Sequence, residues 1–156
     1  MKQKKLMLLG GIRYLLPVIK AAHEQGYYVI TADYLPDNIA HKYSDEYVNV
    51  SIVDKEAVLK VAQEKQIDGI MSFGVDPGVV AASYVQNKMG LPSFGPFESV
   101  EILQNKDKFR AFLTEHGFNG LSASQARKRH GCLVTNFHIL LLLSLPIRQA
   151  ARDAHV

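Results

Sequence analysis

Short apolar runs that end in glycine or turn residues alternate along the chain with segments whose apolar residues recur at helical spacing. The runs are rich in β-formers and predict buried strands, and the periodic segments predict amphipathic helices. Strands are predicted at residues 4–9, 27–33, 47–53 and 67–73, with a short edge strand at 91–94. Helices are predicted at 13–25, 55–65, 77–89, 96–104 and 105–116, and Asp54 is predicted to be the N-cap of the second of these. This alternation predicts an α/β fold with an open, mostly parallel, Rossmann-like sheet and helices on both faces.

The first apolar run, Lys4-Lys-Leu-Met-Leu-Leu-Gly-Gly11, is the strand beside which the later units are expected to lie. Its two glycines predict a tight turn into a helix whose free N–H groups face the end of the strand. Gly10 and Gly11 either bind a phosphate or carboxylate through these groups or only form the turn, and the sequence leaves both readings open. Asp33 stands about where an acidic ribose ligand would stand, but the further glycines of a dinucleotide fingerprint are missing. A nicotinamide or flavin site is therefore disfavoured.

Two other residues are candidates for ligand binding. Asp76 follows the turn at Gly74 and precedes Pro77 at a predicted helix start, where N-capping would account for it. The alternative is a carboxylate directed at a substrate over the end of the fourth strand. Lys106 lies at the start of the last predicted helix, where it either reaches a nucleotide phosphate or belongs to a solvated face. No metal-ligand spacing and no nucleophile beside a base is visible, so no catalytic or metal-binding residue is predicted.

Composition narrows the class of protein. The chain of 156 residues fits one domain, and its single cysteine excludes an internal disulfide and suits a reducing, cytoplasmic location. The short first apolar run argues against a signal peptide, and the run at 137–145 is too short to span a membrane. The net charge of +3 comes from the last 37 residues, with five Lys or Arg and one acid. We expect neither a nucleic-acid partner nor a membrane partner.

The order and spacing of several motifs carry a family resemblance. The segments concerned are Leu6–Gly11, Gly26–Asp33, Ile67–Asp76, Gly90–Pro92 and the pair Asn105-Lys106 eleven residues before Gly117. Together, residues 4–119 resemble the N-terminal (pre-ATP-grasp) domain of ATP-grasp ligases. Within this family, they most resemble the domain of carbamoyl-phosphate-synthase-like proteins. No single motif is decisive, but their order over about three quarters of the chain is fairly specific.

The resemblance implies an ATP- and Mg²⁺-dependent carboxylate–amine ligase, in which ATP phosphorylates a carboxylate and an amine attacks the acyl phosphate. Lys106 then corresponds to the first lysine that binds the ATP phosphates. The turns at Gly10-Gly11 and Gly74 would border the substrate, with Asp33 and Asp76 beside them. The family's second lysine, glycine-rich loop, adenine hinge and magnesium ligands cannot be matched in this chain. Neither ATP nor Mg²⁺ is therefore expected to bind it tightly.

The family pattern breaks at Asn119, after which members usually continue with a proline and a lysine. The codons permitted for residues 143–150, read two bases out of frame, can encode Lys-Pro-Thr-Asp-Ser-Ser-Gly. The family has a sequence of this kind at its second lysine and glycine-rich loop. We expect residues 120–156 to be an out-of-frame translation and the chain to be truncated. The alternative is a genuine, unusual extension.

These readings give three segments: a Rossmann-like domain at 1–104, the first helix of an ATP-grasp domain at 105–119 and an atypical tail at 120–156. The expected function is that of an N-terminal ligase fragment that cannot catalyse alone. A stand-alone α/β module that binds a small ligand or nucleotide is the alternative, and half of a split ligase is a third. The expected partners are a small carboxylate or amine substrate and either the missing ATP-grasp portion or a second copy of the chain.

Overall fold

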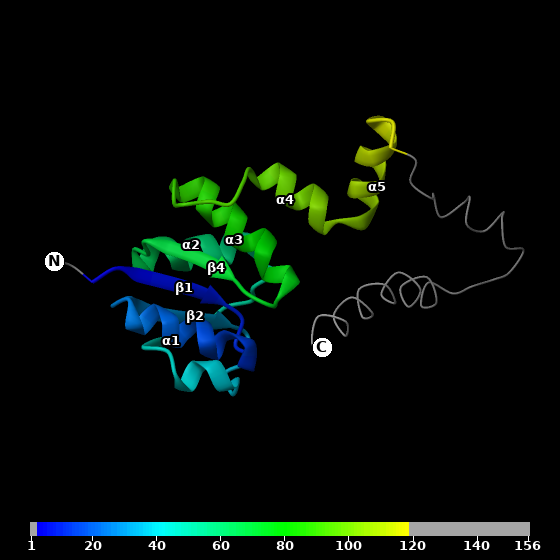
Figure 1. Ribbon diagram of the computed structural model, residues 1–156. Coiled ribbons are helices and arrows are strands. Elements are labelled where there is room, and N and C mark those ends of the chain that lie inside the picture. Colours follow the sequence, from blue (N-terminus) through cyan, green and yellow to red (C-terminus); the bar gives the residue numbers. More distant parts are fainter. Residues whose placement is uncertain (1–2, 119–156) are drawn as a thin grey trace, which may run out of the picture. The chain divides into compact units, whose positions relative to one another are not determined.

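The computed structural model describes residues 3–118 (Figure 1). It divides at Phe109, inside the last helix, and the parts before and after that residue are described separately. The predicted tail at 120–156 and its reading frame lie outside the described residues. The predicted boundaries at 104 and 119 stay predictions.

The described chain before Phe109 alternates strands and helices. Its strands are β1 (Lys5–Leu9), β2 (Tyr28–Asp33), β3 (Glu46–Asn49) and β4 (Gly69–Ser72). Its helices are α1 (Leu16–Glu24), α2 (Lys55–Lys65), α3 (Asp76–Met89), α4 (Phe97–Gln104) and α5 (Lys106–Glu115), and α5 continues past the division. Two 3₁₀ helices, η1 (Arg13–Leu15) and η2 (Ile39–Lys42), precede α1 and β3.

The four strands form one sheet in the order β3-β2-β1-β4, and every pair is parallel. The central strand is β1, because Met7 is in register with Ile30 of β2 on one side and Ile70 of β4 on the other. The predicted α/β class and the central place of the first strand are both confirmed.

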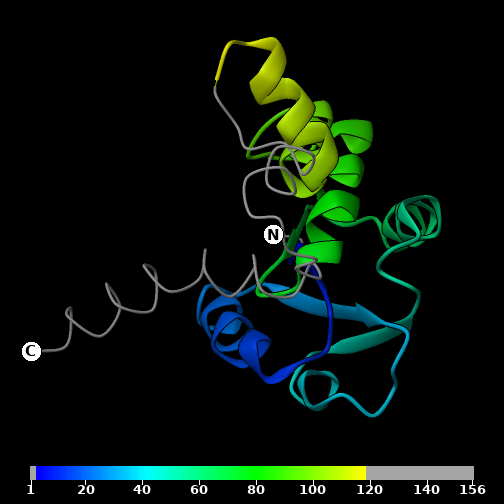
Figure 2. The ribbon, with the colours of Figure 1, turned by 90° about the vertical axis from the view of Figure 1, so that its right-hand side faces the viewer.

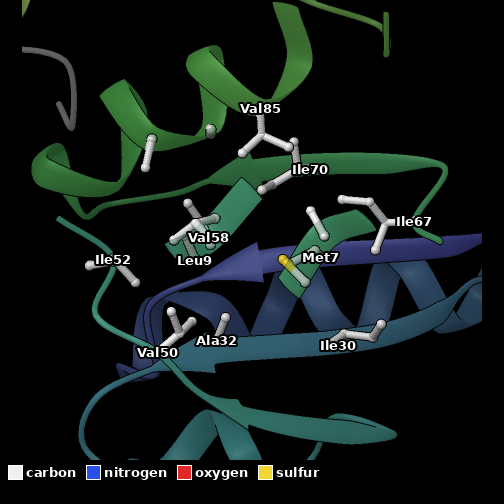
Figure 3. Close-up of a cluster of buried hydrophobic side chains, with 13 residues drawn as sticks. Met7, Leu9, Ile30, Ala32, Val50, Ile52, Val58, Ile67, Ile70 and Val85 are labelled. Carbon is white, nitrogen blue, oxygen red and sulfur yellow. The ribbon is translucent and has the colours of Figure 1, made fainter. Parts of the chain in front are cut away.

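Helices cover both faces of this sheet, as predicted, with α1 on one side and α3 on the other (Figure 2). On the face of α2 and α3, a cluster of aliphatic side chains joins these two helices to the sheet (Figure 3). Its members include Met7, Leu9, Ile30, Val58 and Val85, and all five are completely buried. Burying a side chain of this kind contributes roughly 1.5–3 kcal/mol each, so this cluster is the main source of stability.

Local signals set several of the helix bounds. The Asp54 carboxylate accepts a hydrogen bond from the Ala57 N–H at 3.0 Å, which makes Asp54 the N-cap of α2, as predicted. The predicted helix at 13–25 is split, since η1 ends before α1 begins at Leu16. Pro17 lies in the first turn of α1, where it has no N–H to donate into the preceding turn.

The predicted edge strand at 91–94 is wrong, because those residues form no strand. The side chain of Asn87 shapes this connection: its amide donates to the Gly95 carbonyl at 3.3 Å, and its oxygen accepts from Phe97 N–H at 3.3 Å. Leu91 packs against the core instead of extending the sheet. The third strand is also shorter than predicted, since a turn from Ser51 to Asp54 follows it.

Candidate functional site

The carboxyl ends of the strands form the edge at which a ligand site is expected. The chain leaves β1 towards the face of α1 and leaves β4 towards the face of α3, so the two connections diverge between adjacent strands. Ligands of open α/β sheets bind at such a switch point. Of the residues predicted from the sequence, Gly10, Gly11, Gly74 and Asp76 follow these two strands.

The turns after β1 and β4 contact each other. Gly10 has a φ of +106°, and a Cβ placed on it would lie 3.0 Å from Cγ2 of Val75. Gly74 has a φ of +70°, and a Cβ there would lie 3.4 Å from Cβ of Tyr14. Only glycine adopts such angles without strain, so both turns need it for the chain to pass this closely.

The turn after β1 also packs against the loop after β2. Gly11 is buried, and a Cβ on it would lie 2.5 Å from Cβ of Asn38 and 2.6 Å from Nε2 of His41. Its carbonyl accepts a hydrogen bond from the Ala40 N–H at 3.0 Å. Close packing therefore accounts for Gly11, which favours the turn reading of this residue.

Asp33, at the end of β2, is 5% exposed and bonded within its own loop. One carboxylate oxygen accepts from the Leu35 N–H at 3.3 Å and the other accepts from the Asn38 amide at 3.0 Å. The carboxylate of Asp33 thus orders the loop that packs on Gly11. Its predicted role as a direct substrate ligand stays a prediction.

A partly buried polar network beside this loop has no counterpart among the sequence predictions. His41 bonds through Nδ1 to the Thr31 hydroxyl at 2.9 Å and through Nε2 to the Leu35 carbonyl at 3.1 Å. Since a carbonyl can only accept, Nε2 donates to the Leu35 carbonyl. The ring of Tyr47 lies 4.2 Å from the His41 ring, and burial, with Asp33 and Asp37 nearby, raises the pKa of Tyr47.

Asp76 is not the N-cap of α3, which corrects the capping interpretation. The capping position belongs to Val75, which makes no side-chain bond to the helix, and Asp76 is the first helical residue. Its exposed carboxylate has no hydrogen bond or ion pair to any other residue of the described part. A negative charge in the first turn is favoured by the helix dipole, so Asp76 is stable there and free to meet a ligand.

Gly78, which the sequence reading did not single out, brings α3 to this edge. It is buried, and a Cβ on it would lie 2.6 Å from Oγ of Ser72 and 3.2 Å from Cβ of Leu9. The first turn of α3 therefore rests directly on the ends of β4 and β1. A glycine two residues into a predicted helix that follows a strand was the available signal.

Apolar side chains are exposed around the same edge. Five of them, here called the apolar rim, follow β1, β2 and β4: Ile12, Tyr14, Tyr34, Leu35 and Phe73. Tyr14 and Tyr34 are 61% and 58% exposed. Exposed apolar residues gathered at one place mark an interaction surface more often than scattered ones do.

Lys106 comes from a different element. Asn105 caps α5, because its side-chain oxygen accepts from the Asp107 and Lys108 N–H groups at 3.0 Å each. Lys106 therefore lies in the first turn, exposed, and no ion pair of its ammonium is found within residues 3–118. No described hydrogen bond or ring contact joins it to the strand-end turns, so the structure does not unite it with the other predicted residues.

A separate hollow of about 530 Å³ opens between α1 and the α1 side of β4. Its lining is mostly apolar, with Leu6, Val18, Met71 and Pro92, and it lies away from the turns that follow the strands. Within residues 3–118, no three His, Cys, Asp or Glu side chains gather in a way that could hold a metal ion. No helix in that same range is long and apolar enough to cross a membrane.

Comparison with known proteins gives matches at the level of structure. The chain matches no protein-family profile and no curated protein sequence. It is similar to phosphoribosylglycinamide synthetase from Anaerococcus prevotii, with 23% identity and a TM-score of 0.65 over 74% of this chain and 29% of that one. An L-amino acid ligase from Bacillus licheniformis gives 23% identity and a TM-score of 0.58 over 76% and 32%.

A third similar structure is N5-carboxyaminoimidazole synthetase from Staphylococcus aureus complexed with ADP. It gives 17% identity and a TM-score of 0.57 over 75% of this chain and 31% of that one. These neighbours are ATP-grasp ligases, and this chain spans about 30% of their length. At such identities the likeness establishes the fold, and residues 3–118 share the fold of the N-terminal portion of ATP-grasp ligases.

Proposed function

We propose that this chain is the N-terminal part of an ATP-dependent ligase that joins a carboxylate to an amine through an acyl phosphate. The observation that carries the proposal is the shared fold over about three quarters of the chain with ATP-grasp ligases. The switch point at the ends of β1 and β4 supports it, because Gly10, Gly74 and Asp76 follow these two strands, where we propose that they border a substrate. We propose a cytoplasmic location, which suits a single cysteine and a nucleotide substrate.

The residues of α5 fit a role beside a nucleotide. A lysine in the first turn of a helix is opposed by the positive end of the helix dipole. Lys106 nevertheless occupies that position without a described anionic partner, whereas Lys108 pairs with Glu101 at 3.1 Å. A phosphate group beside Lys106 would provide the missing negative charge.

The described residues supply only a part of such a site. ATP, when bound, supplies the phosphoryl group that activates a carboxylate. Lys106 would hold a phosphate oxygen through its ammonium, and the turns at Gly10 and Gly74 would position the substrate. No cluster of carboxylates fit for Mg²⁺ occurs within residues 3–118, so no step is assigned to a metal ion there. Catalysis then requires a further portion of protein, and this chain alone should not turn over ATP.

The test compares nucleotide binding by two proteins. One is this chain, and the other is a protein in which residues from 120 onward are replaced by the alternative reading frame. One charge-assisted contact contributes roughly 1.5–3 kcal/mol, while millimolar affinity already requires about 4 kcal/mol. We expect calorimetry to find only weak ATP binding by this chain and tight binding, with ADP release, by the reframed protein.

Lys106→Ala in the reframed protein should weaken ATP binding by roughly ten- to a hundredfold, the factor those energies imply. The matched control is Lys60→Ala, which removes an exposed lysine from α2. Equal ATP affinity of the reframed protein and its Lys106→Ala variant would remove Lys106 from the nucleotide site. Robust ATP turnover by this chain alone would contradict the fragment proposal, and the nucleotide sequence across codons 115–156 checks the frame directly.

A second candidate is a stand-alone module that binds a small ligand at the same edge. The observation in its favour is that the turns at Gly10, Gly11 and Gly74 and the loop ordered by Asp33 are all complete within the described residues. A thermal-shift screen of this chain separates the two. Low-micromolar stabilisation by a small acid or nucleotide would favour the module over the fragment.

A further inference from the structure

The charges around the apolar rim are unevenly distributed. The segments that run from the last residue of each strand to the first residue of the next helix are residues 9–13, 33–39, 49–55 and 72–76. They contain two cations, Arg13 and Lys55, against four carboxylates: Asp33, Asp37, Asp54 and Asp76. Asp33 and Asp54 are engaged by backbone and amide groups, while Asp37 and Asp76 are exposed. The side-chain charges at this edge are therefore net negative, which favours a positive ligand group.

Tyr14 connects the apolar rim to the free carboxylate. Its side chain lies against Gly74, at 3.4 Å from the position of a Cβ there, and Gly74 precedes Asp76 by two residues. Phe73, beside Gly74, is 48% exposed. Aromatic faces and an unpaired carboxylate thus occur together on the turns after β1 and β4. Aromatic rings attract cations through their faces, so both kinds of group favour the same ligand chemistry.

A phosphorylated sugar is a poor fit to the same groups. Such ligands are bound by clusters of Arg and Lys or by uncrowded backbone N–H groups. The cations in these segments are Arg13 and Lys55, and Lys55 lies over the rings of Tyr84 and Phe97. The N–H of Gly10 donates to the Ala32 carbonyl at 2.8 Å. The Gly11 turn is closed by Asn38 and His41.

From these contacts and charges we infer that the strand-end site binds a small amine, as its ammonium ion, that carries an apolar or aromatic body, and that it does not bind a phosphorylated sugar. The inference rests on the proposed function, since it names the class of the amine substrate of that same site. Asp76 holds the ammonium group, and Phe73 and Tyr14 cover the apolar body.

The test titrates the full chain with four small probes and follows backbone amide shifts by NMR. L-phenylalaninamide is cationic and aromatic, 3-phenylpropionate is anionic and aromatic, 3-phenyl-1-propanol is neutral and aromatic, and ribose 5-phosphate is anionic and polar. We expect L-phenylalaninamide to shift the amides of Gly10, Gly74 and Asp76 at the lowest concentration, and ribose 5-phosphate to leave them unchanged.

Two variants separate the contributions of charge and apolar surface. Asp76→Asn should weaken the binding of L-phenylalaninamide by about three- to fivefold, the upper part of the range of one exposed ion pair, and leave the binding of the alcohol unchanged. Phe73→Ala should weaken the binding of both L-phenylalaninamide and 3-phenyl-1-propanol by roughly fivefold, the size of an aromatic contact. The matched controls are Glu98→Gln and Phe94→Ala, which change an exposed carboxylate and an exposed phenyl ring outside the strand-end turns and should change neither affinity.

Three outcomes would overturn the inference. The first is tighter binding of ribose 5-phosphate or 3-phenylpropionate than of L-phenylalaninamide. The second is equal affinity of the chain and its Asp76→Asn variant for L-phenylalaninamide. The third is that no probe shifts the amides of these turns. None of these depends on ATP, so the ligase proposal is judged separately by the Lys106 experiment. Amine binding without any nucleotide site in the reframed protein would keep the inference and reject the ligase.

Discussion

The contact of α3 with the strand ends makes Gly78→Ala an informative substitution. The added methyl group would lie 2.6 Å from Oγ and 3.1 Å from Cβ of Ser72, and 3.2 Å from Cβ of Leu9. Leu9 is completely buried and its Cβ is fixed by β1, so it cannot move aside. The Ser72 hydroxyl can rotate only by losing its hydrogen bond to the Val75 carbonyl at 2.8 Å. The helix itself must therefore shift away from the sheet.

Two opposing terms set the size of the effect. Alanine is favoured over glycine in a helix by up to about 1 kcal/mol. Overpacking a buried site costs about 1–3 kcal/mol, and the lost hydrogen bond costs about 1 kcal/mol more. We expect Gly78→Ala to lower the free energy of unfolding by about 1–3 kcal/mol, because the steric cost and the lost hydrogen bond together exceed the gain in helix propensity.

Urea unfolding followed by circular dichroism measures this difference. The matched control is Gly95→Ala, since a Cβ there meets nothing within 4 Å and should leave the free energy of unfolding nearly unchanged. In a double-mutant cycle, Ser72→Ala removes the nearest atom and should reduce the cost of Gly78→Ala. A Gly78→Ala protein as stable as the parent chain would refute the close contact between α3 and the strand ends.

Gly11→Ala should lower the free energy of unfolding by about 2–3 kcal/mol, because two side chains lie within 3 Å of the new Cβ, and urea unfolding measures the loss. Burial would raise the pKa of Asp45, but hydrogen bonds from a backbone N–H and from His23 hold that pKa below its ordinary value. The resulting stability is present above about pH 4 and is lost as pH falls through the folded-state pKa. Asp45→Asn should therefore flatten the decline of the melting temperature below about pH 4.5. An unchanged pH profile of the melting temperature would contradict this account. Asn105→Ala should speed amide exchange in α5, because removing an N-cap costs about 1 kcal/mol of helix stability. Asp54→Ala is its control, and it should act on α2 and leave exchange in α5 as it was.

The parts of the fold that sequence predicts well are those determined by neighbouring residues. The buried runs before Gly10 and around Ile30 and Ile70 have strand-forming composition at fixed spacing, and they form β1, β2 and β4. The cap at Asp54 depends on a residue three positions away, and it is present as predicted. Topological rules then place the turns at the ends of β1 and β4 on one edge.

The parts that sequence does not predict depend on contacts between distant segments. Residues 91–94 have the composition of a strand, but Asn87, on the preceding helix, holds the segment that follows them. The need for glycine at Gly78 follows from Ser72 and Leu9, and Leu9 is far from it in sequence. The bond between His41 and Thr31 joins a 3₁₀ helix to a strand and follows no periodic pattern.

The central place of β1 has a consequence for synthesis on the ribosome. This strand emerges first, yet its second neighbour, β4, begins only at Gly69, and the aliphatic cluster is completed by Val85 of α3. A nascent chain that lacks α3 leaves the cluster around Met7 and Leu9 without Ala81, Ala82 and Val85. We therefore expect the fold to form late, and a cotranslational folding experiment with arrested chains should find protease resistance only after α3 has left the exit tunnel.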